Sequence, residues 1–162
     1  MHRFLLFATV FVFSWGGVNG YFDETPTCTS VSQYESEISK ICPDDVHLLA
    51  RLVNSEAAGE SFTGQLYVAN VVVNRALWNG QTIREVIFAR KQFSGVKTER
   101  FDEEPHPNHI LAAKKALRGD GPLPLNVLYF CNPETSTNKK FVNFCRKNLH
   151  ISHGGHIFAI KK

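Results

Sequence analysis

A glutamate on the apolar side of a predicted helix is the feature that most constrains this chain. Residues 44–58 carry apolar side chains at helical spacing, which predicts a core-facing stripe that leads to Glu56 and consists of Val46, Leu49, Leu52 and Val53. Burial disfavours the charged form of a carboxyl group and raises its pKa. A shift from about 4.3 to about 6 costs roughly 2.3 kcal/mol and gives a proton donor near neutral pH. The alternatives are a structural glutamate neutralised by a buried Arg or Lys, and one that reaches solvent.

Residues 1–20 have the composition of a secretory signal peptide. Arg3 gives a basic start, residues 4–15 are almost entirely apolar, and small residues at 18–20 suit a signal peptidase. The apolar run is short for a bilayer, so we expect export to the periplasm or the extracellular cell wall, with no stable membrane span after cleavage. A retained membrane anchor is the alternative. Residues 21–43 are polar and predict an N-terminal tether, and residues 44–162 predict one domain.

Four cysteines follow the predicted signal peptide. An even number in an oxidising compartment favours disulfides over a metal site or a catalytic thiol. Three pairings are possible, and we favour Cys28 with Cys42 and Cys131 with Cys145, each closing a loop of about 15 residues worth roughly 3 kcal/mol. A thiol enzyme, in which Cys131 or Cys145 acts with His156, is the alternative.

The net charge and the spacing of the cysteines and histidines argue against nucleic acid and metal ions as ligands. The net charge of +3 is too small to indicate nucleic acid binding, although it suits an anionic extracellular polymer. No cysteine and histidine cluster has metal-ligand spacing, so we expect neither a metal nor another cofactor.

Helix start and stop signals divide the first two thirds of the domain. Asp44 is predicted to cap the first helix and Gly59 to end it. A second helix is predicted over 63–77, with a buried side made of Leu66, Ala69, Val72, Val73 and Ala76. A capping box predicts a short third helix over about 82–89, and a proline in the first turn predicts a fourth over 107–118. Between these two helices, residues 90–107 predict an irregular charged loop.

The last third has a different character. Residues 127–131 and 156–160 are short, aromatic and β-branched, and they predict strands of a small sheet. The expected fold class is therefore α+β, with a helical lobe followed by a small β lobe and a cleft between them.

Several strings of residues resemble a known family. LLARLVNSEAAGE at 48–60, GQ at 64–65 and VANVVVNR at 68–75 are similar to the opening of the cell wall hydrolases that include the spore cortex-lytic enzymes SleB and CwlJ. Further matches follow in the same order, namely VIF at 86–88, QFSGV at 92–96, AAKKAL at 112–117, YFCNP at 129–133 and GGHIF at 154–158. The similarity spans residues 46–160. It implies a lysozyme-like, transglycosylase-like fold and makes residues 44–162 a cell wall hydrolase catalytic domain.

The resemblance also implies an activity. Members of this family cleave peptidoglycan glycan strands between N-acetylmuramic acid and N-acetylglucosamine, and their catalytic glutamate corresponds to Glu56 in the SEAAGE string. We expect a lytic transglycosylase, in which Glu56 acts first as acid and then as base. Two alternatives remain. A lysozyme-type hydrolase would need a second carboxylate, with Glu60, Asp102, Glu103 and Glu104 as candidates. A catalytically inactive peptidoglycan-binding protein would need none.

Five further residues are candidates for substrate binding. Ser94 suits an acetamido group or a turn, Tyr129 suits a sugar face, and Asn132 suits the glycan or the turn before the next proline. Glu60 and His156 are the other two, with a surface or structural role as the alternative for each. The expected partner is the peptidoglycan glycan strand, and we expect the protein to act as a monomer.

Overall fold

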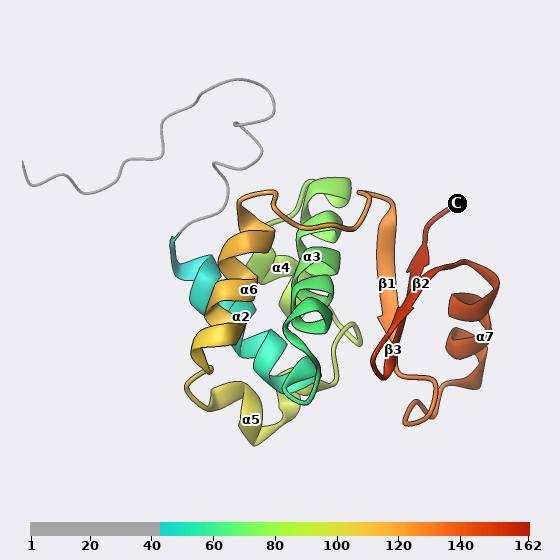
Figure 1. Ribbon diagram of the computed structural model, residues 1–162, viewed down its shortest axis with the longest axis horizontal. Helices are drawn as coiled ribbons and strands as arrows, with labels where there is room; N and C mark the ends of the chain where they lie inside the picture. The colour runs from blue at the N-terminus through green and yellow to red at the C-terminus, as the bar shows by residue number, and fades with distance from the viewer. Residues whose placement is uncertain (1–42) are drawn as a thin grey trace, which may run out of the picture.

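The structure is a computed structural model, and it describes residues 43–162 (Figure 1). The predicted signal peptide, the tether up to residue 42 and the pairing of Cys28 with Cys42 lie outside these residues. Within them, no helix is both long enough and apolar enough to cross a membrane.

The helical lobe is built around three longer helices that share one core. Its elements are α2 (Pro43–Ala57), α3 (Phe62–Asn79), α4 (Ile83–Phe88), the 3-10 turn η1 (Gly95–Lys97), α5 (Glu99–Asp102) and α6 (Pro107–Leu117). Helices α2, α3 and α6 pack against one another, and α3 also packs against the first strand. Helix α3 is therefore buried on nearly all sides and forms the centre of the molecule (Figure 1).

Most of the predicted helix ends are confirmed. Gly80 ends α3 with a φ of 63°, a conformation that favours glycine, and Thr82 forms a capping box with Glu85 at the start of α4. The prediction that Asp44 caps α2 is wrong, because the helix already begins at Pro43. A proline suits the first helical position, and Asp44 lies in the first turn, where its charge faces the positive end of the helix dipole.

The expectation of a wholly irregular segment at 90–107 is also wrong. This segment contains η1 and α5. Phe101 anchors α5, because its ring is buried, packs edge to face on Phe88 at 6.0 Å and lies under the guanidinium of Arg51. One apolar residue within a charged run was too weak a pattern to predict a helix.

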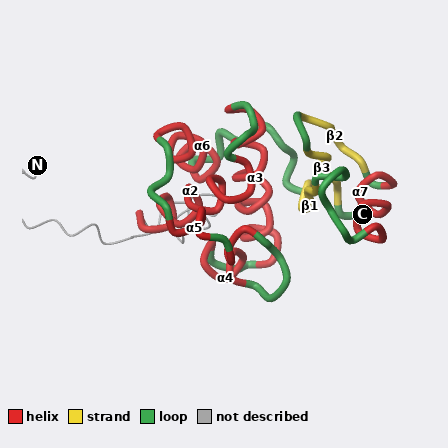
Figure 2. Tube along the Cα trace, turned by 90° about the horizontal axis from the view of Figure 1, so that it is seen from below, coloured by secondary structure: helices red, strands yellow, loops and turns green. Residues whose placement is uncertain are grey.

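The β lobe contains the two predicted strands and two elements that were not predicted. Strands β1 (Val127–Cys131) and β3 (His156–Ile160) are confirmed. Helix α7 (Lys139–Lys147) and strand β2 (Leu149–His153) are additional. The strands are antiparallel in the order β1-β3-β2, and the sheet lies between α3 and α7 (Figures 1 and 2).

The sheet buries a different set of side chains on each face. Phe130 and Phe158 join the main core beside α3, whereas Cys131 and Ile157 pack with Cys145 of α7 in a second cluster. Alternate strand residues point to opposite faces of a sheet, which explains the division.

Asparagine side chains of α3 attach the chain before β1 to the helical lobe. Asn70 accepts a hydrogen bond from the Leu123 backbone N–H at 2.8 Å. Asn74 donates to the carbonyl groups of Pro124 and Val127 at 2.8 and 3.1 Å. Buried polar groups that are paired in this way hold one strand in a defined position against the helix. Side chains of α3 therefore contribute to the relative placement of the two lobes.

Candidate active site

A cleft of about 750 Å³ runs between the C-terminal end of α2, the segment after α4 and the β lobe. Its walls include all six residues that the sequence proposed for the site, which are Glu56, Glu60, Ser94, Tyr129, Asn132 and His156. These residues are far apart in the chain, and the fold brings them to one cavity of the size that ligand sites usually have.

Glu56 lies in the last turn of α2 with its carboxyl group in the cleft wall. Its Oε1 accepts a hydrogen bond from the Gly95 backbone N–H at 2.6 Å. Burial raises the pKa of Glu56, and this rise is opposed by the Gly95 hydrogen bond and by the positive charge of Arg75. The carboxyl group is therefore biased toward the protonated form, while two groups are in place to stabilise the carboxylate that remains after proton transfer.

Gly95 approaches Glu56 more closely than any other residue type allows. A Cβ atom at this position would lie 2.7 Å from Oε1 of Glu56 and 2.5 Å from Oγ of Ser55. These distances are shorter than van der Waals contact. Glycine at position 95 thus brings a backbone donor against the buried carboxyl group.

Arg75 lines the cleft together with Glu56. It is 9% exposed, and its Nε donates to the carbonyl oxygen of Leu128 at 2.6 Å. Its guanidinium carbon lies 5.0 Å from the ring centre of Phe93 and 5.7 Å from that of Tyr129. Burial lowers the pKa of Arg75 to about 10, so the group still carries its positive charge at neutral pH.

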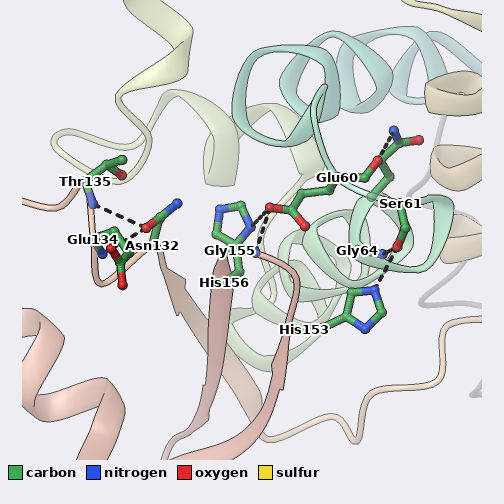
Figure 3. A network of polar contacts seen from close by, with 10 residues as sticks. Glu60, Ser61, Gly64, Asn132, Glu134, Thr135, His153, Gly155 and His156 are labelled. Atoms are coloured by element: carbon green, nitrogen blue, oxygen red, sulfur yellow. Dashed lines mark hydrogen bonds and ion pairs between the residues drawn. The ribbon is translucent and has the colours of Figure 1, made fainter.

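Glu60 follows α2 and does not share its apolar stripe, as the glycine at 59 predicted. Its Oε1 accepts a hydrogen bond from the Gly155 backbone N–H at 3.1 Å and lies 3.2 Å from Nδ1 of His156. Both partners belong to the turn and strand of the β2–β3 hairpin (Figure 3). This carboxylate therefore joins the helical lobe to the hairpin.

The other predicted binding residues differ in how many contacts their side chains already make within the protein. Ser94 is exposed and makes no side-chain cap bond at η1. Tyr129 is held edge to face against Phe141 and Phe144. Asn132 fixes the turn after β1, because its Oδ1 accepts hydrogen bonds from two backbone N–H groups.

The remaining acidic candidates lie away from the cleft. Asp102 pairs with Arg51, and Glu104 lies 3.2 Å from His47. Neither these two residues nor Glu103 lines the cleft, whose carboxylates are Glu56 and Glu60. No cluster in residues 43–162 contains three or more side chains able to hold a metal.

Cys131 and Cys145 lie side by side as buried thiols in the second cluster. The structure therefore does not contain the predicted disulfide between them. Burial raises the pKa of Cys131, and it raises the pKa of Cys145 to about 12. Both thiols are protonated at neutral pH, which is unfavourable for a thiolate nucleophile.

Sequence reasoning assigned no role to Arg75 or Gly95. Both fall within strings that the family shares, VANVVVNR and QFSGV, and those strings were the only signal for them. The contacts themselves join residues that are 39 and 53 positions apart, so no local pattern contains them.

Comparisons with known proteins identify the family of the chain. The family model described as Cell Wall Hydrolase matches residues 59–159, and the chain belongs to that family. The chain is 37% identical over 98 residues to a spore cortex-lytic enzyme of Oceanobacillus iheyensis, a match that covers 59% of this chain and 35% of that protein. It is 29% identical to the cell wall hydrolase CwlJ of Bacillus subtilis, over 61% of this chain and 75% of that protein. The chain thus spans about a third of the length of the spore cortex-lytic enzyme.

A solved structure has the same fold. The catalytic domain of the germination-specific lytic transglycosylase SleB from Bacillus anthracis matches with a TM-score of 0.64 and 29% identity. The match covers 73% of this chain and 95% of that domain. The α+β arrangement of a helical lobe and a small β lobe is therefore confirmed.

Proposed function

We propose that this protein is a secreted enzyme that cleaves peptidoglycan between N-acetylmuramic acid and N-acetylglucosamine, acting as a lytic transglycosylase. The observation that carries the proposal is the environment of Glu56, a buried carboxyl group in a cleft with a backbone donor at 2.6 Å. Membership of the cell wall hydrolase family and the likeness to the SleB catalytic domain support the same substrate.

One carboxyl group suffices for the proposed reaction. Protonated Glu56 donates its proton to the glycosidic oxygen as the bond from that oxygen to the muramic anomeric carbon breaks, and the N-acetylglucosamine side leaves with a new hydroxyl group. The resulting carboxylate then takes the proton of the muramic C6 hydroxyl while its oxygen bonds to the anomeric carbon. A 1,6-anhydro sugar forms, Glu56 is protonated again, and no water is consumed. Gly95 and Arg75 stabilise the carboxylate between the two steps.

Product analysis tests the proposal directly. The protein is incubated with purified sacculi, and the soluble products are analysed by mass spectrometry. Anhydro-muropeptides are expected. Reducing muropeptides would instead indicate lysozyme-type hydrolysis with Glu60 as the second carboxylate, and the absence of released products would indicate a binding protein. The Glu56→Gln protein should bind sacculi and release products at least about 10²-fold more slowly.

Export and a disulfide belong to the same proposal. Residues 1–20 would direct export, and the mature protein would act in the cell wall as a monomer. In that oxidising compartment the neighbouring thiols of Cys131 and Cys145 would join and attach α7 to β1 beside the cleft. Thiol titration of the exported, denatured protein tests this. No reactive thiol is expected, and four would contradict the proposed oxidation.

A further inference from the structure

The carboxylate of Glu60 is enclosed by three glycines. A Cβ atom would lie 3.2 Å from Oε2 at position 64, 1.7 Å from Oε2 at position 154, and 3.1 Å from Oε1 at position 155. The side chain of Glu60 is only 15% exposed, although the residue lies in the cleft wall. Within this enclosure the carboxylate contacts the β2–β3 hairpin, where Gly155 and His156 are its partners (Figure 3).

The contact with Glu60 favours one tautomer of His156. Nδ1 of His156 is buried and has no hydrogen bond of regular geometry within residues 43–162, but Oε1 of the Glu60 carboxylate lies 3.2 Å from it. Because a carboxylate can only accept a hydrogen bond, this contact favours the tautomer in which Nδ1 carries the hydrogen and Nε2 keeps its lone pair. Burial also lowers the pKa of His156, which keeps the ring neutral. The side chain is 8% exposed and packs edge to face on Phe130 at 5.5 Å, so the ring plane is held as well.

Asn132 supplies a hydrogen-bond donor that complements the acceptor nitrogen of His156. Its Oδ1 is occupied by the backbone N–H groups of Glu134 and Thr135 at 2.9 and 3.2 Å. Its Nδ2 donates to no described residue and lies 2.9 Å from the Cβ position of Gly155. The register pairs Cys131 with Ile157, so Asn132 and His156 are the next residues opposite each other on one side of the sheet.

We propose that Asn132 and His156 form a subsite for an amide group of the glycan substrate. The Asn132 amide N–H would donate to the amide carbonyl oxygen, and Nε2 of His156 would accept from the amide N–H. Glu60 acts through His156 and is a positioning residue. The inference rests on the proposed function, because it takes peptidoglycan as the substrate. Beyond the proposed function, it identifies the group of that substrate that the β lobe recognises.

Peptidoglycan carries amides in two places, the 2-acetamido groups of the sugars and the stem peptides. The experiment measures co-sedimentation of the full-length, exported Glu56→Gln protein with three forms of sacculi, namely intact, stripped of stem peptides, and chemically de-N-acetylated. His156→Ala and Asn132→Ala are added singly to this background. Each should weaken binding to intact sacculi about 3- to 10-fold, the effect of one lost hydrogen bond.

The three substrates separate the possible sources of the amide. If the loss persists on stem-stripped sacculi and vanishes on de-N-acetylated sacculi, the subsite holds an acetamido group. If it vanishes only on stem-stripped sacculi, the subsite holds a stem amide. De-N-acetylated sacculi keep every hydroxyl group, so an equal loss on all three forms would overturn the inference. Because binding is measured without cleavage, this result is independent of whether the wild-type protein releases anhydro-muropeptides.

A matched histidine controls for the anchoring of the hairpin. His153 lies in the same hairpin and contacts Oγ of Ser61 at 2.8 Å, but it does not line the cleft (Figure 3). His153→Ala should therefore leave the preference between acetylated and de-N-acetylated sacculi unchanged. For Glu60, the readout is the nitrogen NMR signal of His156. The proton should reside on Nδ1, and Glu60→Ala, which removes the acceptor, should shift it toward Nε2. A proton found on Nε2 of the unsubstituted residue would overturn the positioning role.

Discussion

The helical lobe contributes both glutamates of the cleft, Glu56 at the end of α2 and Glu60 in the turn that follows, and the two carboxyl groups have different surroundings. Glu56 has one backbone donor at 2.6 Å, and burial raises its pKa. Glu60, four residues later, is enclosed by glycines and contacts the hairpin through Gly155 and His156. The comparison shows that one carboxyl group of the cleft is suited to donate a proton, whereas the other holds the hairpin that carries the proposed binding residues. Residue type alone does not distinguish these roles.

The largest expected difference between the two glutamates is in the rate of glycan cleavage. Glu56→Gln removes the transferable proton and should lower the rate about 10²- to 10⁴-fold, the usual contribution of general acid–base catalysis. Glu60→Gln keeps an acceptor near His156 and should lower it about 10-fold or less. Initial rates of muropeptide release from sacculi measure both. Equal losses would mean that Glu60 takes part in the chemical step.

The second prediction concerns the glycine enclosure on the hairpin side. Gly154 has a φ of 55°, and an added Cβ would lie 1.7 Å from Oε2 of Glu60. Gly154→Ala should cost backbone strain and also displace the carboxylate, a total of about 2–4 kcal/mol. Gly80 has a φ of 63° with nothing near its Cβ position, so Gly80→Ala should cost the strain alone, about 1–2 kcal/mol. Urea unfolding measures both free energies.

A double mutant isolates the contribution of the carboxylate. In a Glu60→Ala protein, Gly154→Ala should cost only the backbone strain, as Gly80→Ala does. The difference, expected at about 1–2 kcal/mol, is the coupling between the hairpin turn and the carboxylate. Strictly additive free energies would show that the enclosure does not hold Glu60.

The two sides also differ in how far the sequence predicted them. The helical side follows strong local patterns, because an apolar stripe placed Glu56 and caps placed the ends of α3 and α4. On the other side, β2 was missed because it is a short edge strand whose residues are mostly exposed and whose only apolar side chains are Leu149 and Ile151. Helix α7 was missed because its apolar residues, although at helical spacing, extend over only nine residues, fewer than the roughly 11 or more over which such a pattern is usually recognised.

For the candidate site, the sequence predicted the residues but not their contacts. All six predicted residues line the cleft, but their partners could not be predicted from local spacing. The role of Glu60 depends on a glycine turn that lies 95 residues later in the chain. Arg75 depends on a backbone carbonyl that becomes available only where β1 meets α3. Such contacts follow from the packing of the lobes rather than from any pattern in one segment.

The smallest predicted effect is a pH-dependent gain in stability on the helical side. Burial raises the pKa of Glu56 in the folded protein. Its contribution to stability is therefore greatest below the unfolded pKa and is lost as the pH rises through the folded pKa. Glu56→Gln removes this loss, and it should stabilise the protein by about 0.5–2 kcal/mol at about pH 8 and have little effect at about pH 4. Thermal unfolding at both pH values measures the change.

Glu85 provides a control of opposite sign. Hydrogen bonds from the backbone and side chain of Thr82 lower the pKa of this exposed carboxyl group. Its stabilising contribution is therefore present above the unfolded pKa and is lost as the pH falls through the folded pKa. Glu85→Gln should lower the unfolding temperature near neutral pH, with a difference that closes on acidification. If Glu56→Gln behaved in the same way as Glu85→Gln, the buried glutamate would be stabilised as a carboxylate, and its assignment as the proton donor would be wrong.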